Sequence, residues 1–312
     1  MTATLRAADL GVELPVLPID RAFTPIYAEP VEISPLLRRV LARNPGPFTF
    51  GGTGTYIIGR GRVAVVDPGP LIAEHVEALQ QALRGETITH VLITHTHSDH
   101  SPAAAPLKAL TGAPTYGFGP HGAGKLNSGV VVEEGGDMDF RPDVTLRDGA
   151  VIAGDGWTVD CVYTPGHTSN HLCFGLREER ALFSGDHVMG WSTTVIVPPD
   201  GDMAEYFASL SILQARTDDL FYPTHGNPIP HPQNFVSKLI EHRRARERQL
   251  AACLTRGITR IPEMVAVIYS EIDARLHPAA AMSVLAHLQH MVASGRATTE
   301  GAPTGQSVYH SK

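Results

Sequence analysis

The sequence predicts an α/β protein with mixed strands, in which helices cover sheets, followed by a small helical module. Three observations lead to this fold class. Short apolar, strand-like segments alternate with segments of helical spacing through most of the chain. A chain of 312 residues with 43% hydrophobic residues can bury at least one substantial core. The last part changes to helices and a Gly-rich end, so we predict domains at residues 1–235 and 236–312.

The first part of the chain supplies strands and helices in turn. Two β-branched segments are joined by the tight turn Arg60-Gly61. A helix start is predicted where Ser101 can cap the backbone and Pro102 takes the first helical position. The elements expected here are a short helix at Pro35–Ala42, strands at Thr55–Gly59, Arg62–Val66 and Ile88–Thr94, and helices at Leu71–Leu83 and Ser101–Leu110.

The middle of the chain favours sheet, and helices return after it. Short strand-like segments separated by turn residues run from Thr115 to Asp186. The tail fits a small helical module with a β-hairpin wing. We expect strands at Val130–Val132, Val144–Leu146, Trp157–Tyr163, Leu172–Leu176, Ala181–Ser184 and Asp219–Tyr222, helices at Met203–Ala215, Pro232–Thr255 and Pro278–Ala293, short helical segments near Ile261–Ile272, and the wing at Gly295–Gly305.

Composition excludes several classes of protein. The formal net charge is −7 and only 18% of the residues are charged, which excludes a disordered polyelectrolyte. The longest apolar runs, such as Val63–Val66, are far too short to span a bilayer. Three cysteines cannot form a disulfide framework. The segment Met1–Pro15 has no basic start followed by an apolar stretch, so we expect a cytoplasmic protein.

Histidine is unusually frequent, with 16 in the chain, and one segment concentrates it. The sequence His95-Thr-His-Ser-Asp-His100 directly follows a predicted strand. In such a loop, His95 and His97 can converge on one cation, while Asp99 and His100 face a second. Imidazole and carboxylate are ordinary ligands of Zn²⁺. The alternative, a polar loop that is His-rich by chance, is disfavoured because clustered histidines normally need a partner.

Three more polar residues come just beyond predicted strands. They are His167 in Thr-Pro-Gly-His-Thr, Asp186 in Phe-Ser-Gly-Asp-His and His225 in Tyr-Pro-Thr-His-Gly. Their Gly and Pro neighbours let the backbone turn sharply, so that one side chain points inward. Each motif alone is weak evidence. Together with the first segment they supply five His and two Asp at strand ends, which is enough for two metals.

The order of these residues resembles the metallo-β-lactamase superfamily. The pattern of that family is an Asp after an early strand, here Asp67, then H-x-H-x-D-H, then single His, Asp and His residues, and it spans roughly residues 45–230. The resemblance implies an αββα sandwich with the metals in a cleft at one edge of the two sheets. It also implies the ligand sets: His95, His97 and His167 for one metal, Asp99, His100 and His225 for the other, and Asp186 as the bridge between them.

The motifs around His167, Asp186 and His225, with the helix Ile240–Gln249, resemble the lactamase-β-2-like branch, which adds a C-terminal winged-helix module. Animal members of that branch are zinc-dependent endoribonucleases acting on single-stranded RNA. The resemblance implies a dinuclear zinc hydrolase that uses a metal-bridging hydroxide, with Mn²⁺ or Fe²⁺ as alternative metals.

Three functions stay open at this point. The first is cleavage of single-stranded RNA, and the second is hydrolysis of a small thioester or lactone, as in glyoxalase II. The third is a winged-helix nucleic-acid-binding protein, which the complete ligand set disfavours. No membrane partner is expected, and the oligomeric state is open, with a homodimer as one alternative.

Several neighbours of the predicted ligands allow two interpretations. Asp99 is also a candidate catalytic group, because its carboxylate can accept a hydrogen bond from the hydroxide. His171 is a candidate for contact with the substrate or leaving group, or for a structural hydrogen bond. Asp67 either ties down the ligand loop or simply ends a strand. Side-chain alternation turns His187 away from Asp186, so we expect it to be structural.

The loop at residues 190–200, called the 190s loop below, and the tail carry further candidates. Thr193 and Thr194 are expected near the substrate, and Trp191 in the core or at the rim. His287 and His290 have ligand-like spacing but are expected on a solvated helix face. The basic run Arg243-Arg-Ala-Arg-Glu-Arg is also expected to be solvated. Its alternative role is to attract phosphates, because residues 236–312 hold 10 basic against 6 acidic residues.

Overall fold

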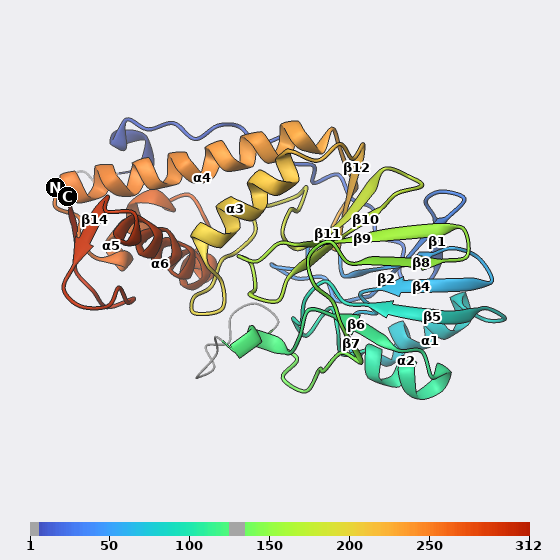
Figure 1. Ribbon diagram of the computed structural model, residues 1–312. Coiled ribbons are helices and arrows are strands. Elements are labelled where there is room, and N and C mark those ends of the chain that lie inside the picture. The colour runs from blue at the N-terminus through green and yellow to red at the C-terminus, as the bar shows by residue number, and fades with distance from the viewer. Residues whose placement is uncertain (1–5, 125–134) are drawn as a thin grey trace.

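The computed structural model describes residues 6–124 and 135–312. Two β-sheets face each other, with α1 and α2 outside the first sheet and α3 and α4 outside the second (Figure 1). A small helical module follows at one end of this sandwich. The predicted αββα sandwich with a C-terminal winged-helix module is therefore confirmed.

The first sheet has seven strands in the order in which they occur in the chain. The first four pair antiparallel, and the rest add parallel through crossover connections. Its elements are β1 (Pro30–Glu32), β2 (Leu37–Leu41), β3 (Gly54–Ile58), β4 (Arg62–Val66), α1 (Ala73–Ala82), β5 (Thr87–Leu92), α2 (Ala104–Thr111), β6 (Thr115–Gly117) and β7 (Val144–Thr145).

The second sheet has six strands in the order β13-β12-β11-β10-β9-β8. All its pairs are antiparallel except β11 with β12, which run parallel because α3 connects them. Its elements are β8 (Val151–Gly154), β9 (Trp157–Tyr163), β10 (Leu172–Leu176), β11 (Ala181–Gly185), α3 (Met203–Gln214), β12 (Leu220–Pro223) and β13 (Ile229–Pro230).

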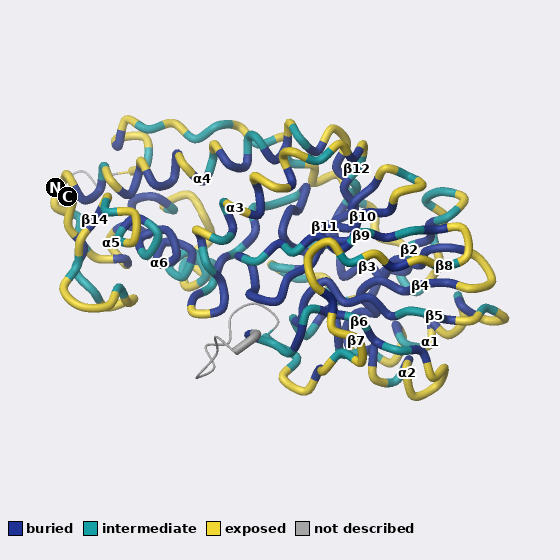
Figure 2. Tube along the Cα trace, in the orientation of Figure 1, coloured by how far each residue is buried: buried dark blue, intermediate teal, exposed yellow. Residues whose placement is uncertain are grey.

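The principal core lies between the two sheets, and the tube in Figure 2 is buried along most of the central strands. Trp157, Tyr56 and Phe174 are among the large side chains in this layer, and each is at most 1% exposed. A second cluster fills the space between the first sheet and α1 and α2, and a third lies under α3 and α4. Both sheets are therefore covered on both faces by packed layers.

The module contains the second half of a long helix, two further helices and a hairpin. Its core joins Leu250 and Cys253 to Met264 and Leu288. The elements of the module are α4 (Pro232–Thr255), α5 (Ile261–Ile268), a 3₁₀ turn at Ala274–Leu276, α6 (His277–Ala293), β14 (Ala297–Thr299) and β15 (Tyr309–Ser311). Two other 3₁₀ turns lie outside it, at Ala7–Leu10 before β1 and at His121–Gly124 after β6. The expected domain division after residue 235 falls inside α4 and stays a prediction.

One predicted element is wrong. The sequence predicts a helix at residues 35–42, but this segment contains β2 instead. The strand is covered on both faces: Leu37 belongs to the core between the sheets, and Val40 to the core beneath the outer helices. A strand buried on both sides shows no alternation of apolar and polar residues, so its sequence pattern is ambiguous.

The remaining predictions differ from the structure mainly at the ends of elements. The predicted cap Ser101 lies before α2 rather than at its start, and its hydroxyl donates to Asp137 at 2.7 Å. The strand predicted at Val130–Val132 lies outside the described residues. Among the residues that are described, no helix combines the length and apolar character needed to cross a membrane.

Candidate metal centre

The predicted ligands lie in loops that follow strands. The segment from His95 to His100 follows β5, His167 follows β9, Asp186 follows β11 and His225 follows β12. Their donor atoms form three groups in which every atom lies within 4.8 Å of the others. The groups are His95 with His97 and His167, His95 with His100 and Asp186, and Asp99 with His100 and His225. The fold thus brings all seven predicted ligands together.

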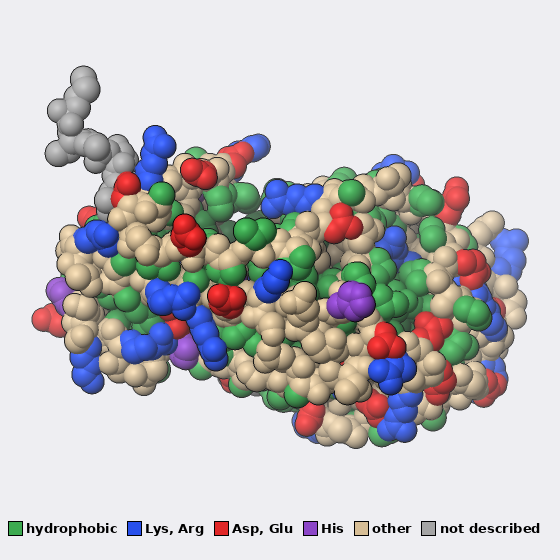
Figure 3. Space-filling model, turned by 90° about the horizontal axis from the view of Figure 1, so that it is seen from above, with side chains coloured by type: hydrophobic (Ala, Val, Ile, Leu, Met, Phe, Trp, Pro, Cys, Tyr) green, Lys and Arg blue, Asp and Glu red, His purple; other side chains and the backbone are tan. Residues whose placement is uncertain are grey.

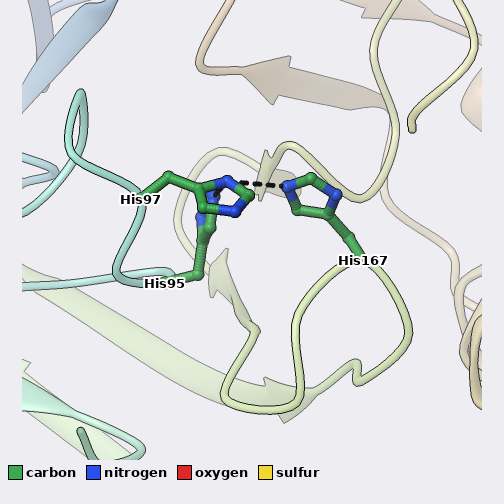
Figure 4. Close-up of side chains that lie close together, drawn as sticks. All are labelled: His95, His97 and His167. Atoms are coloured by element: carbon green, nitrogen blue, oxygen red, sulfur yellow. Dashed lines mark hydrogen bonds between the residues drawn. The ribbon is translucent and has the colours of Figure 1, made fainter. Parts of the chain in front are cut away.

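The first group consists of three imidazoles (Figure 4). His97 Nδ1 lies 3.0 Å from His95 Nε2 and 3.2 Å from His167 Nε2. The Nδ1 atom of His167 faces the carbonyl oxygen of Val195 at 2.9 Å. Because a carbonyl only accepts, that nitrogen carries the proton, and the Nε2 lone pair points at the other rings. Burial lowers the pKa of all three histidines and thereby favours the neutral form that a metal ligand needs.

The other four candidate ligands, Asp99, His100, Asp186 and His225, include two carboxylates. His225 Nε2 lies 3.3 Å from Asp99 Oδ2 and 3.4 Å from Asp186 Oδ2. His100 Nε2 lies 3.4 Å from Asp99 Oδ1 and, again, 3.4 Å from Asp186 Oδ2. The carboxylate of Asp186 therefore faces both of these imidazoles. It also shares a donor group with His95 of the first set, so it lies between the two sets, as expected of a bridging ligand.

The other nitrogens of these two rings are held by acceptors. His225 Nδ1 donates to the carbonyl oxygen of Gly52 at 3.0 Å, and His100 Nδ1 donates to Asp67 Oδ2 at 2.9 Å. Both Nε2 lone pairs therefore face carboxylate oxygens, which repels unless a proton or a cation lies between them. His100 Nε2 and Asp186 Oδ1 are buried and lack a hydrogen-bond partner. This donor set fits a divalent cation.

The ionisation of this group follows from the same contacts. Burial alone would lower the pKa of His225, but the carboxylates of Asp186 and Asp99 outweigh it and raise the pKa to about 10. The pKa of His100 is likewise raised, against burial, by Asp99 and Asp186. The raised pKa values indicate that the carboxylates stabilise positive charge at the Nε2 atoms of both rings.

Asp67 ties the ligand loop to the neighbouring strands. Its Oδ1 accepts from the Thr94 backbone N–H at 2.8 Å, and its Oδ2 accepts from the Thr94 hydroxyl at 2.6 Å and from His100. The residue is 1% exposed and has a φ of 46°, so it also makes a sharp turn at the end of β4. The two interpretations offered by the sequence therefore hold together.

His171 and His187 lie behind the centre and are fully buried. The ring of His171 is 5.0 Å from that of His95, its Nδ1 bonds the Thr164 hydroxyl at 2.9 Å, and its Nε2 has no partner. The ring of His187 packs against Tyr206 at 4.5 Å, turned away from the cluster as alternation predicts. A catalytic role for His171 stays a prediction.

A pocket opens beside the centre. It is lined by Asp99, Asp186 and His225 and, on its other sides, by side chains of the 190s loop and the module. Trp191 is half-buried at this rim and stacks on Phe50, with ring centroids 4.8 Å apart. Thr193 and Thr194 line the pocket as well. Other apolar and module residues in the wall include Pro47, Phe48, Met189, Val195, Arg243, Tyr269, Ile272, Leu276, Ala279, Ala280 and Ser283.

Two expectations about the tail are wrong. Arg243 and Arg246 are 4% and 7% exposed, so the basic run is not a solvated face. His287 is fully buried, and His290 donates to the buried carboxylate of Glu247 at 2.7 Å. The reason is that α4 packs between α3 and α6, which leaves only a narrow strip of it in solvent.

Sequence reasoning also missed residues that position the ligands. The Thr53 hydroxyl donates to Asp99 Oδ2 at 2.8 Å, and the Gly52 carbonyl holds His225. A Cβ on Gly52 would lie 2.2 Å from the Ala42 carbonyl oxygen, so only glycine fits there. The clustered glycines at residues 51–54 are the signal that could have located this close backbone approach.

Fold, ligand geometry and comparison agree on the class of protein. The model of the metallo-beta-lactamase superfamily matches residues 48–225, and that of the beta-lactamase associated winged helix domain matches residues 261–306. The chain belongs to the metallo-β-lactamase superfamily, and the predicted hydrolase class is confirmed.

Two curated relatives are similar to this chain over most of its length. A beta-lactamase-like protein 2 homolog of Caenorhabditis elegans is 35% identical over 237 residues, which is 73% of this chain and 74% of the relative. An atrochrysone carboxyl ACP thioesterase of Pseudocercospora fijiensis is 32% identical over 237 residues, covering 75% of this chain and 65% of the relative.

A solved structure supports the fold over nearly the whole chain. A beta-lactamase domain protein from Burkholderia ambifaria superposes with a TM-score of 0.76 at 20% identity, covering 95% of this chain and 97% of that one. At this identity the likeness concerns the fold alone.

Proposed function

We propose that this protein is a dinuclear metal-dependent hydrolase that cleaves a small acyl substrate, with an acyl thioester as the first candidate. The observation that carries the proposal is the set of converging imidazole and carboxylate groups at the edge of one largely apolar pocket. Zinc is the metal that this set of imidazoles and carboxylates suits best.

The seven predicted ligands divide between two metals. His95, His97 and His167 would hold one, and Asp99, His100 and His225 the other, with Asp186 between them. Bound there, the metals would lower the pKa of a water nucleophile and polarise the scissile carbonyl.

The chain's own residues prepare this chemistry. The carbonyl oxygens of Val195 and Gly52 fix the rings of His167 and His225, so their Nε2 atoms face the centre before any metal arrives. Thr53 holds one oxygen of Asp99, whose carboxylate would accept a hydrogen bond from the attacking water. Such preorganisation avoids reorienting these groups during the reaction.

The apolar lining of the pocket favours a small acyl substrate over RNA. Its wall includes Phe48, Met189, Trp191 and Tyr269, which suit an apolar acyl group. On the face that Figure 3 shows, Lys and Arg side chains lie among Asp and Glu over most of the surface, and several gather toward one end without forming a continuous track along the molecule. Relatives named as thioesterases point to the same chemistry. Hydrolysis of single-stranded RNA is the alternative outcome of the test.

The test combines metal analysis with a substrate panel. We expect two equivalents of zinc per chain, and turnover of an acyl thioester faster than of a homoserine lactone, a cephalosporin or single-stranded RNA. His97→Ala and Asp186→Asn should abolish turnover while circular dichroism stays unchanged. The exposed Asp219→Asn is the matched control for the second variant. Full activity in a metal-free chain would refute the proposed metal centre. Turnover of RNA and of none of the acyl substrates would refute the proposed substrate class.

A further inference from the structure

Arg243 has an unusual position for a cation. It lies in the middle of α4, is 4% exposed, and lines the pocket that contains Asp99, Asp186 and His225. Its neighbour Arg244 on the same helix is exposed. The guanidinium is therefore withdrawn from bulk solvent and borders the space where a substrate would lie.

The hydrogen bonds of Arg243 leave it only partly satisfied. Its Nη2 donates to the carbonyl oxygen of Thr194, and its guanidinium lies over the ring of Tyr206 at 5.2 Å. Its Nε is buried without a partner. Within residues 6–124 and 135–312, no carboxylate forms an ion pair with it. The buried acid nearest in sequence, Glu247, binds His290 and Arg296 instead.

A buried charge without a counter-ion is costly, and a guanidinium has five donors arranged to match a carboxylate or phosphate. The surrounding contacts would keep this fork in place. Thr194 joins it to the metal centre, because its carbonyl accepts from Arg243 while its hydroxyl donates to the main-chain oxygen of Asp186 at 2.7 Å. An anion bound at Arg243 would thus lie in the same pocket as the reacting bond.

We infer that Arg243 is a specificity residue that binds an anionic oxygen group of the substrate, either a carboxylate or a phosphate. This inference rests on the proposed function, since it concerns the second end of the molecule hydrolysed there. The module completes the site: Tyr269, Leu276 and Ser283 line the same pocket from α6 and the segment between α5 and α6. The module thereby acts in substrate selection through the walls of this pocket.

The anion has two chemical sources, and the substrates separate them. One is a carboxylate at the far end of the acyl chain. The other is a phosphate on the thiol-bearing part of the substrate, at the end far from the sulfur, as in phosphopantetheine. Four thioesters test both: an ω-carboxyacyl or a simple acyl group, each joined to pantetheine or to phosphopantetheine.

We expect either the ω-carboxylate or the phosphate to raise kcat/KM on the order of 10–100-fold over the thioester that lacks it, which is the range for a charged hydrogen bond. Arg243→Gln should remove that preference, so that the ratio of kcat/KM between the anionic and the neutral thioesters falls to about one, whatever the absolute rates. Arg243→Lys should keep part of the preference. The control Arg244→Gln removes the same charge from the exposed face and should keep all of it. Equal kcat/KM for all four thioesters in the unaltered protein would overturn the inference.

A binding measurement separates this inference from the proposed function. Trp191 lines the pocket and Trp157 is buried in the core, so quenching of Trp191 fluorescence reports occupancy. Amide analogues of the four thioesters, which resist hydrolysis, serve as probes. We expect the anionic analogue to bind more tightly than its methyl ester or dephospho counterpart, and Arg243→Gln to equalise them. Equal binding in the unaltered protein overturns the role of Arg243, whereas selective binding without turnover overturns only the proposed thioesterase activity.

Discussion

Asp67→Asn offers the sharpest test of how the ligand loop is held. The carboxylate accepts three short hydrogen bonds, from the Thr94 backbone N–H, the Thr94 hydroxyl and His100 Nδ1. An amide of the same shape has only one acceptor oxygen. If that oxygen takes the backbone N–H of Thr94, the amide N–H₂ faces His100 Nδ1, which is also a donor. If the amide flips, the clash moves to Thr94.

The expected magnitude follows from this arrangement. No orientation of the introduced amide satisfies both donors. His100 must therefore tilt, which turns its Nε2 away from the centre, or change tautomer, which places a proton on Nε2 and removes the lone pair. Loss of such a supporting partner weakens metal affinity about 10–100-fold, or about 1.4–2.7 kcal/mol. The effect should fall mainly on the metal that Asp99, His100 and His225 would hold, since Asp67 bonds His100 directly. It reaches His95 only through the Thr94 hydroxyl, and His167 is oriented by the Val195 carbonyl.

The assay is competition for zinc against a chromophoric chelator, read as two separate affinities per chain. Asp219→Asn, at an exposed carboxylate paired with Arg180, is the control for removing one negative charge. We expect one affinity to fall in Asp67→Asn and neither to fall in the control. Two unchanged zinc affinities in Asp67→Asn would refute the reasoning.

Two further variants test the packing of the molecule. Burial alone would raise the pKa of Glu247, but hydrogen bonds that include those from His290 and Arg296 hold it well below the usual value of 4.5. This stabilisation is full above pH 4.5 and is lost as the pH falls below it, so Glu247→Gln should lower stability by about 1.5–3 kcal/mol at pH 7 and progressively less in acid. Thermal unfolding across pH tests this, and a pH-independent difference would contradict it. Trp157→Ala should cost about 3–5 kcal/mol in urea unfolding, because the indole is fully buried between the sheets. The control Val151→Ala, at a half-exposed edge position, should cost far less.

The grouping of the candidate ligands could be predicted because its signal is local. Each ligand is a polar residue that closely follows a short apolar strand, and strands that end at one edge of a sandwich bring such residues together. His187 could also be assigned, since alternation alone turns it away from Asp186 and against Tyr206. These inferences need only the period of a strand and the position where it stops.

The predictions that failed depend on what lies next to an element. The sequence of β2 has no strand period because both of its faces are covered, and Arg243 looks like a surface residue because arginine normally is one. In each case the deciding fact is a neighbour distant in sequence. For β2 it is the second sheet on one face and the outer helices on the other, and for Arg243 it is the 190s loop. No local pattern encodes such a neighbour.

The continuity of α4 explains why the module can shape a pocket that belongs to the metal centre. The helix runs for 24 residues without glycine and with proline only at its first position. Its first half packs Val236 and Leu239 beneath the second sheet, and its second half packs Leu250 and Cys253 into the module. A helix of this kind has no hinge, so the two parts cannot move independently without breaking a core. Arg243 lies between those halves and is held by both the 190s loop and Tyr206, so the position of the cation over the pocket is as fixed as the ligands themselves.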